Sequence, residues 1–249
     1  MLKEERFEVI LNELKNNKKV KFEDLAVQLN VSEDTVRRDI DALHRNGLLS
    51  KARGGAILRE KDPLTFQDRQ SFLTKEKDII ALKTQQFIKN GMTVFMDGGT
   101  TILAVVNAMP LDINIKIVTN NYSIVTIIEK FKNVELILLG GTYEKDLAVT
   151  SGLTTCYETS KYIADFFIMG TCAVDPVYGV SATSTNDGET KKMMVQSSKQ
   201  TIALASRNKL SQTESFKVCD MSQVDTLITD LDSNDVDLND FRKLNIQIV

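Results

Sequence analysis

The sequence has 249 residues, which suits a small domain followed by a larger one. The formal net charge is −3, and no apolar run approaches transmembrane length, so a membrane-spanning protein is excluded. The only histidine is His44, which excludes a histidine-rich metal or catalytic cluster, and we predict no metal, no cofactor and no catalytic residue. Cys156, Cys172 and Cys219 are widely spaced and no signal peptide precedes them, so we expect buried free thiols in a cytoplasmic protein.

The first 30 residues predict two amphipathic helices. Apolar residues recur at helical spacing in residues 3–15 and again in residues 22–29, with a polar break between the two runs. Only Asn30 and Val31 then separate the second helix from Ser32. Two helices joined by so short a turn must cross, which is the arrangement of a helix-turn-helix.

Residues 31–41, VSEDTVRRDID, begin a third predicted helix. Ser32 is a suitable N-cap, and the two acids that follow it favour the positive end of the helix dipole. Val36, Ile40 and Leu43 form one apolar stripe, which predicts that this side of the helix is buried.

The other faces of this helix are polar and cationic. Thr35, Arg37 and Arg38 lie near its N-terminal end, where a recognition helix reads base edges and contacts phosphates in the DNA major groove. An ordinary surface helix with the i,i+4 ion pairs Asp34–Arg38 and Arg37–Asp41 explains the helix alone equally well.

The next residues predict a hairpin. The helix is expected to end at Gly47, residues 48–53 predict a strand, Gly54-Gly55 a turn, and residues 56–58 the return strand. A hairpin after a recognition helix is a wing, and Lys51 and Arg53 on it suit the phosphate backbone. Six Lys or Arg residues stand against two acids between positions 35 and 59, so the basic footprint is local and small. So small a footprint favours binding to DNA as a dimer or larger assembly.

The stretch VSEDTVRRDIDALHRNGLLSKARGGA resembles the helix-turn-helix and wing signature of the DeoR family of bacterial transcription regulators. Two positions depart from the family's usual residues: His44 replaces an acid and Ala52 replaces a histidine. We interpret His44 as a helix-surface residue. The resemblance implies binding to a double-stranded DNA operator through Ser32, Thr35, Arg37, Arg38, Lys51 and Arg53.

Residues 1–58 are therefore expected to form a winged helix-turn-helix domain, and the polar residues 59–74 a linker. From residue 75 to residue 249, short buried strands alternate with helices, which predicts a mostly parallel α/β sheet. The expected strands are 93–97, 115–119, 134–139, 165–170, 201–205 and 226–230, and the expected helices include 77–89, 102–108 and 122–131. The fold class is thus a two-domain α/β protein.

Small and polar residues collect at the carboxyl ends of the predicted strands, where parallel sheets bind ligands. The most informative step is Asp97 to Thr101, DGGTT, which joins a strand to a helix that begins with two hydroxyl residues. Free amides and hydroxyls there suit an anion, most naturally a phosphate. The step matches neither a Walker A loop nor a GxGxxG fingerprint. A tight strand-to-helix turn capped by Thr101 explains it equally well.

The segments MDGGTT, TNN, LILLGGTY, DFFIMGT and LITD closely resemble the sugar-phosphate sensor domain of DeoR-family regulators, a fold similar to ribose-5-phosphate isomerase. By position, the resemblance implies that the threonines and the glycine amides at 98 and 99 hold the phosphate. The aspartate and asparagine would meet sugar hydroxyls, the other glycines would let the backbone approach the ligand, and the lysine would add a cation. The implied effector-binding residues are Asp97, Gly98, Gly99, Thr100, Thr101, Asn120, Gly140, Gly141, Gly170 and Lys209.

Two departures concern this second domain. The family's usual Asp-Ser-Ser-Lys is Ser206-Arg207-Asn208-Lys209 here, so an acid near the sugar is missing. An acidic pair is replaced by Asn186-Asp187, with Glu189 close by. For Asp187 and Glu189, a negatively charged helix start is as good an explanation as ligand contact. Both departures leave open which sugar phosphate is sensed and whether the response is retained.

These patterns predict a transcription regulator, a homodimer or homotetramer that represses carbohydrate-metabolism genes until a phosphorylated sugar binds. The effector must bind two states with different affinity. The rival hypothesis is a sugar-phosphate isomerase-like enzyme fused to a DNA-binding head, with Asp97 and Lys209 transferring protons. Ser206 in place of an acid leaves that enzyme fewer candidate bases. A third hypothesis is a constitutive DNA binder whose second domain serves only oligomerisation.

Overall fold

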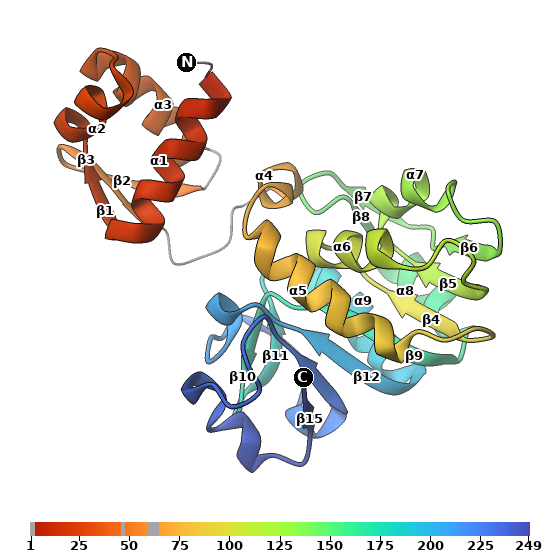
Figure 1. Cartoon of the computed structure of the whole chain (residues 1–249). Coiled ribbons are helices and arrows are strands. Elements are labelled where there is room, and N and C mark those ends of the chain that lie inside the picture. Colours follow the sequence, from red (N-terminus) through yellow and green to blue (C-terminus); the bar gives the residue numbers. More distant parts are fainter. Residues whose placement is uncertain (1–2, 46–47, 59–64) are drawn as a thin grey trace. The chain divides into compact units, whose positions relative to one another are not determined.

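The computed structural model describes residues 3–45, 48–58 and 65–249. The chain forms two compact units, Met1–Phe72 and Leu73–Val249, and Figure 1 follows them from red to blue. A short helix, α4 (Phe66–Gln70), lies in the range predicted as a linker. The boundaries at residues 58 and 75 stay predictions, and the helix end predicted at Gly47 lies outside the described residues.

Besides α4, the first unit has the three predicted helices, and its sheet contains one strand more than the predicted hairpin. Its elements are α1 (Lys3–Asn17), β1 (Lys19–Lys21), α2 (Phe22–Leu29), α3 (Glu33–Arg45), β2 (Leu49–Ala52) and β3 (Gly55–Leu58). The sheet order is β1-β3-β2, with β1 antiparallel to β3. The sequence does not predict β1, because its three residues fall in the polar break and it becomes a strand only by pairing.

Gly55 lets β1 approach β3. A Cβ atom at this position would stand 1.9 Å from the backbone oxygen of Val20, so a side chain here would push the two strands apart. The turn itself depends on Gly54, whose φ of +82° lies in the region that favours glycine. The Gly-Gly pair therefore serves two purposes, the turn and the strand contact.

The apolar stripe of α3 faces the core of the first unit, as predicted. Val36, Ile40 and Leu43 are fully buried and pack with apolar residues of α1 and α2. Burial of one such side chain contributes about 1.5–3 kcal/mol. Because three of them lie on one side, the stripe determines which face of α3 is left to solvent.

The second unit is built on a seven-stranded sheet in which every neighbouring pair is parallel. This confirms the predicted fold class. In spatial order the strands are β15 (Gln247–Ile248), β14 (Thr226–Ile228), β12 (Ser198–Leu204), β9 (Ala164–Gly170), β4 (Thr93–Met96), β5 (Ile115–Thr119) and β6 (Val134–Leu138). The strand β15 is an addition to the six predicted ones.

The strand order reverses between β4 and β9. From β4 the chain continues through β5 to β6 on one side, whereas β9 leads through β12 and β14 to β15 on the other. Ligands of parallel sheets bind beyond the carboxyl ends of the strands at such a reversal. The residues that follow β4 and β9 are therefore the candidates for a ligand site.

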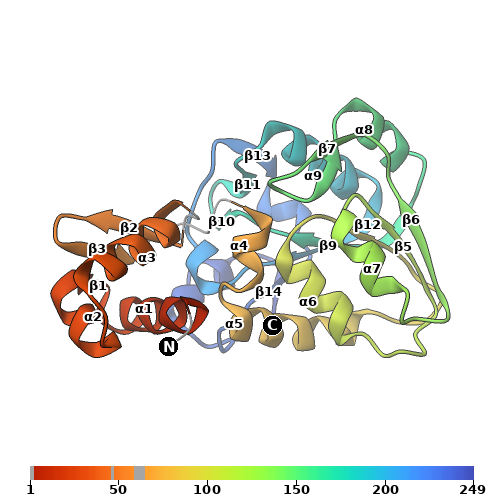
Figure 2. The same ribbon diagram turned by 90° about the horizontal axis from the view of Figure 1, so that it is seen from above.

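Helices cover both faces of this sheet. Figure 2 shows α5 (Thr74–Thr84), α6 (Thr100–Ala108) and α7 (Val125–Ile128) on one face, and α8 (Leu153–Thr159) and α9 (Thr185–Gln196) on the other. The helix predicted at 77–89 begins earlier, at Thr74, and ends in a 3-10 turn at Phe87. The helix predicted at 122–131 begins with a 3-10 turn and ends early, at Ile128. Among the described residues, no helix combines the length and apolar character needed to cross a membrane.

Two small antiparallel sheets, which the sequence does not predict, border the main one. They pair β7 (Thr142–Glu144) with β8 (Val149–Ser151), and join β10 (Ala173–Asp175), β11 (Gly179–Ala182) and β13 (Phe216–Cys219). The three cysteines are free, as predicted, but only Cys219 is buried. The prediction of full burial is wrong for Cys156 and Cys172, which are only partly buried: α8 buries one of its faces, and Cys172 packs at the margin of the core.

Candidate functional site

The start of α3 is organised by Ser32. Its Oγ accepts a hydrogen bond from the Thr35 amide at 3.3 Å and lies 3.0 Å from Thr35 Oγ1, so Ser32 is the predicted N-cap. Asn30, two residues before Ser32, has a φ of +52° and ends α2 in the left-handed region. This local geometry produces the tight turn of the helix-turn-helix.

Arg37 and Arg38 are exposed but held differently. Arg38 lies 3.8 Å from Asp34, which is the predicted i,i+4 pair. Arg37 does not pair with Asp41 as expected: it lies 3.4 Å from Glu33, and its guanidinium carbon stands 4.9 Å from the centre of the Phe22 ring. The aromatic ring of α2 draws Arg37 toward the helix start.

The wing contributes two more exposed bases. Lys51 on β2 lies 2.5 Å from Asp41 of α3, so Asp41 is paired with Lys51 and Arg37 is paired with Glu33. Arg53 is exposed in the turn beside Gly54. His44 is exposed on α3, as predicted, and its Nδ1 also lies 3.2 Å from the Leu49 carbonyl oxygen.

A buried ion pair holds α3 against α1, and sequence reasoning missed it. The Asp39 side chain is only 4% exposed, and Arg6 of α1 donates to both its oxygens at 2.6 and 3.1 Å. Such a two-point pair fixes orientation as well as charge. Asp39 thus neutralises Arg6 and leaves the outward bases of α3 unopposed by its carboxylate.

In the second unit, Asp97 lies at the reversal of the strand order. It follows β4, and its Oδ1 accepts a hydrogen bond from the amide of Gly170, the last residue of β9, at 2.7 Å. Its Oδ2 is ion-paired with Lys191 of α9. The Asp97 side chain has no exposed surface, and its contact with sugar hydroxyls stays a prediction.

Lys191 is the residue that sequence reasoning missed here. It is buried, and it also lies 3.3 Å from Asp187, one helical turn earlier on α9. Asp187 sits in the first turn of α9, where Ser184 caps its amide, whereas Glu189 is exposed. The i,i+4 spacing of Asp187 and Lys191 was the available signal, but only the packing of α9 shows that both are buried.

Burial governs the charges of this cluster. It raises the pKa of Asp97 to about 6, with Lys191 lowering the value and the carboxylate of Asp187 raising it further. Burial lowers the pKa of Lys191, but the attraction of Asp187 and Asp97 outweighs it and the net change is upward. We conclude that the lysine stays charged and that Asp97 is the member that can exchange a proton near neutral pH.

The N-terminus of α6 has the geometry of an anion site. Gly99 is its N-cap, with a φ of +113° and no side chain to bond the first-turn amides, so Thr101 is not the cap. Thr100 and Thr101 form the first turn and are 8% and 7% exposed. A helix start without a capping side chain favours an anion through its free amides and its dipole.

Asn120 lies at the end of β5, beside β4, and is fully buried. Its Nδ2 donates to the Thr150 carbonyl oxygen at 2.8 Å, but its Oδ1 has no hydrogen-bond partner within the described residues. An unpaired buried oxygen costs roughly 1–3 kcal/mol. A donor supplied by a ligand or by water would remove that cost.

The predicted backbone glycines have partners within the chain. A Cβ at Gly170 would stand 2.8 Å from the Gly98 oxygen, and one at Gly141 would stand 2.1 Å from Thr155 Oγ1. Gly140 donates its amide to Glu158 at 2.6 Å. Close packing of the chain on itself therefore accounts for these glycines, and their contact with a ligand stays a prediction.

Lys209 lies near the carboxyl end of β9, where Asp97 also contacts Gly170. Its Nζ donates to the Thr171 carbonyl oxygen at 2.7 Å, one residue beyond Gly170. The structure thus brings Asp97, Gly170 and Lys209 together, whereas Gly140 and Gly141 follow β6 at the edge of the sheet.

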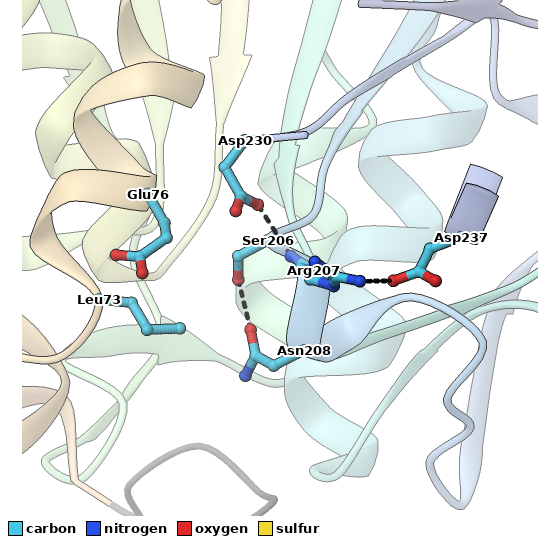
Figure 3. A pocket seen from close by; sticks show the side chains of 7 residues that line it. All are labelled: Leu73, Glu76, Ser206, Arg207, Asn208, Asp230 and Asp237. Atoms are coloured by element: carbon cyan, nitrogen blue, oxygen red, sulfur yellow. Dashed lines mark hydrogen bonds and ion pairs between the residues drawn. The ribbon is translucent and has the colours of Figure 1, made fainter. Parts of the chain in front are cut away.

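A separate cavity of about 420 Å³ lies beyond β12 and β14 (Figure 3). Its lining is Leu73, Glu76, Ser206, Arg207, Asn208, Asp230 and Asp237, which includes none of the predicted effector residues. Arg207 is paired with Asp237 at 2.6 Å, and the other charged groups are acids. This surplus of negative charge disfavours a phosphate, so α6 is the better candidate for one.

Known protein families match both units of the chain. The model of the DeoR-like helix-turn-helix domain matches residues 6–62, and that of the DeoR C terminal sensor domain matches residues 73–231. The HTH-type transcriptional repressor GlcR of Bacillus subtilis is 30% identical, over 92% of this chain and 89% of its own. The glycerol-3-phosphate regulon repressor of Escherichia coli is 29% identical, over 92% of each.

Among solved structures, ribose 5 phosphate isomerase A from Neisseria gonorrhoeae is 15% identical, with a TM-score of 0.40 over 54% of this chain and 52% of its own. The two matched domains define a DNA-binding transcription regulator with a sensor domain. The chain belongs to the DeoR family.

Proposed function

We propose that this regulator represses carbohydrate-metabolism genes and that a phosphorylated sugar bound by the sensor domain relieves the repression. The names of two relatives, a glycerol-3-phosphate regulon repressor and a lactose phosphotransferase system repressor of Lactococcus lactis, support the effector class. We expect the protein to act in the cytoplasm as a homodimer or homotetramer, because the small basic footprint of one head needs a second half-site.

In the head, α3 would enter the major groove and β2–β3 would follow the backbone as a wing. Exposure supports this assignment: α3 turns Arg37 and Arg38 to solvent, while its opposite face is buried. The residues assigned to DNA are Ser32, Thr35, Arg37, Arg38, Lys51 and Arg53. The ion pairs with Glu33, Asp34 and Asp41 are exposed and cost little to exchange for phosphates.

In the sensor, the observation that carries the proposal is the uncapped start of α6 at the reversal of the strand order. The phosphate would bind there, to the amides and hydroxyls of residues 98–101. Asn120 Oδ1, which has no partner among the described residues, would accept a hydrogen bond from a sugar hydroxyl once the chain around this fully buried side chain has moved. Lys209 would add positive charge from the far side of Gly170.

Operator footprinting tests this function. The full chain is bound to DNA from upstream of neighbouring genes, and the footprint is repeated with glycerol 3-phosphate, pentose phosphates, hexose 6-phosphates and the matching unphosphorylated sugars. We expect protection of a site with two-fold symmetry that one phosphorylated sugar removes and its unphosphorylated form does not. A footprint that none of these compounds changes would instead favour a constitutive DNA binder.

A further inference from the structure

Asp97 is bound from within the protein on both sides of its carboxyl group. Gly170 of β9 donates to one oxygen, and Lys191 of α9 is ion-paired with the other. The side chain is 0% exposed, so a ligand cannot touch it without movement of the surrounding chain.

The backbone of Asp97 has a role that needs no such movement. Its carbonyl oxygen accepts a hydrogen bond from Asn121 Nδ2 at 3.2 Å, and the residue leads directly into the Gly98-Gly99 turn that begins α6. Whatever holds the Asp97 side chain therefore holds the turn and the first amides of α6. A displaced turn would misplace every donor that faces a phosphate.

We propose that Lys191 is a positioning residue of the effector site: with Asp187 behind it, Lys191 fixes Asp97 and so holds the anion-binding turn of α6 in place. This proposal rests on the proposed function, because it assumes that the turn binds the phosphate of the effector. Lys191 itself is only 4% exposed and touches two carboxylates, which leaves it poorly placed to bind the phosphate directly.

The balance of charge around Asp97 agrees with this role. Lys191 and Asp187 reach it from α9, and the Gly170 amide reaches it from β9. At the margin of the cluster are Cys172 and Lys209, since the Cys172 thiol interacts with Asp187, Lys191 and Lys209. Two buried carboxylates share one buried lysine, so removal of either neighbour changes how readily Asp97 holds a proton.

The first arm of the test separates positioning from direct sugar contact. Lys191→Met in the full chain removes the charge with little change in length, and Lys192→Met is the matched control, because Lys192 is the adjacent exposed lysine of α9. Affinity is measured for inorganic phosphate by amide shifts of Thr100 and Thr101, and for glucose 6-phosphate and glycerol 3-phosphate by calorimetry. We expect K191M to weaken all three by a similar factor, about ten-fold, and K192M to change none.

The second arm is a pH profile. A simple loss of packing would not move the titration midpoint of Asp97 in opposite directions in the Lys191 and Asp187 variants. In the natural protein, affinity should fall as pH drops through about 6, because Asp97 takes up a proton and releases Lys191. In K191M this ion pair is absent at every pH, so the step in affinity near pH 6 should disappear, while the titration midpoint of the Asp97 carboxyl itself should move to higher pH. Asp187→Asn removes a like charge, so the midpoint should move to lower pH. The phosphate of the ligand titrates identically in every variant.

If K191M folds poorly, D187N and a direct titration of the Asp97 carboxyl by carbon NMR still provide the second arm. Midpoints that move in the same direction, or not at all, would overturn the proposal. So would a K191M protein that binds inorganic phosphate normally but loses the sugar phosphates, which would make the cluster a sugar contact. If the unchanged protein binds no phosphate compound, the proposed function itself fails and this inference falls with it.

Discussion

Arg38 and Arg37 are adjacent in sequence but differ in what else they hold. The Arg38 side chain is 83% exposed, and its pair with Asp34 at 3.8 Å is worth well under about 1 kcal/mol at such a surface. Arg37 also lies over the Phe22 ring, a contact worth about 0.5–1 kcal/mol. Removal of Arg38 should therefore weaken DNA binding alone, whereas removal of Arg37 should also lower the stability of the first unit.

We predict that Arg38→Ala lowers operator affinity by about 1–3 kcal/mol if the side chain reads a guanine edge, without a change in melting temperature. Arg37→Ala should lower both. Fluorescence anisotropy with operator and with scrambled DNA, together with calorimetry of unfolding, measures the two effects.

Lys51→Ala is the control for a backbone contact. It should weaken operator and scrambled DNA alike and flatten the dependence of affinity on salt, because it removes one phosphate contact. If neither arginine nor this lysine changes the binding curve, α3 and the wing are not the DNA-binding surface.

Single residues also show what the sequence could predict. Val36, Ile40 and Leu43 repeat at helical spacing, and such a pattern depends only on neighbours along one helix, so their burial is confirmed. Lys191 carries no comparable pattern: it follows a threonine and precedes another lysine. Its burial is decided by Asp97, 94 residues away. The sequence likewise predicts Asp97 as important but not that it is closed off from solvent.

At the scale of elements, those with an apolar pattern of their own are confirmed, and three of the short strands that lack one are missed. α3 and β5 agree with prediction because each has a continuous apolar pattern. β1 has three residues and is a strand only because Gly55 admits it beside β3. β7 and β10 also have three residues, and each is a strand only through its pairing, with β8 and β11 respectively.

This contact provides a test at the level of the wing. Gly55→Ala places a methyl group 1.9 Å from the Val20 oxygen, and such overpacking costs about 1–3 kcal/mol or more. We expect faster amide exchange in residues 19–21 and weaker operator binding.

Gly54→Ala is the matched control, since nothing lies within 4 Å of a Cβ there and only the positive φ resists it. It should cost about 1 kcal/mol and leave amide exchange in β1 nearly unchanged. Equal effects of the two substitutions would show that β1 is not held against β3.

At the scale of the whole molecule, the proposed effector site and the proposed DNA-binding surface lie in different units of the chain. The two units have separate hydrophobic cores, so a change in one need not unfold the other. The domain organisation is therefore the feature that makes an uninducible variant possible.

We predict that Thr100→Val with Thr101→Val removes two hydroxyl donors at the start of α6 while nearly keeping their shape. The protein should bind operator normally and stay bound when the phosphorylated sugar is added, with effector affinity reduced about ten-fold or more. Gel-shift titrations of operator with and without effector measure this.

Thr126→Val on α7 removes an exposed hydroxyl and should leave induction unchanged. Release from DNA by effector at the usual concentration in the double variant would place the phosphate elsewhere than at α6.

The sensor domain is also tied together across its full length, and this has a consequence for protein synthesis. Lys83 of α5 donates to the carbonyl oxygens of Thr229 and Leu231 at 2.8 and 2.7 Å, more than 140 residues later in the chain. Domains fold as units and the N-terminal one folds first as it leaves the ribosome. The head is therefore complete long before α5 has these partners. A nonsense mutation in the second half of the message should therefore give a fragment with a folded head and no folded sensor, so any repression that remains cannot be relieved by a sugar.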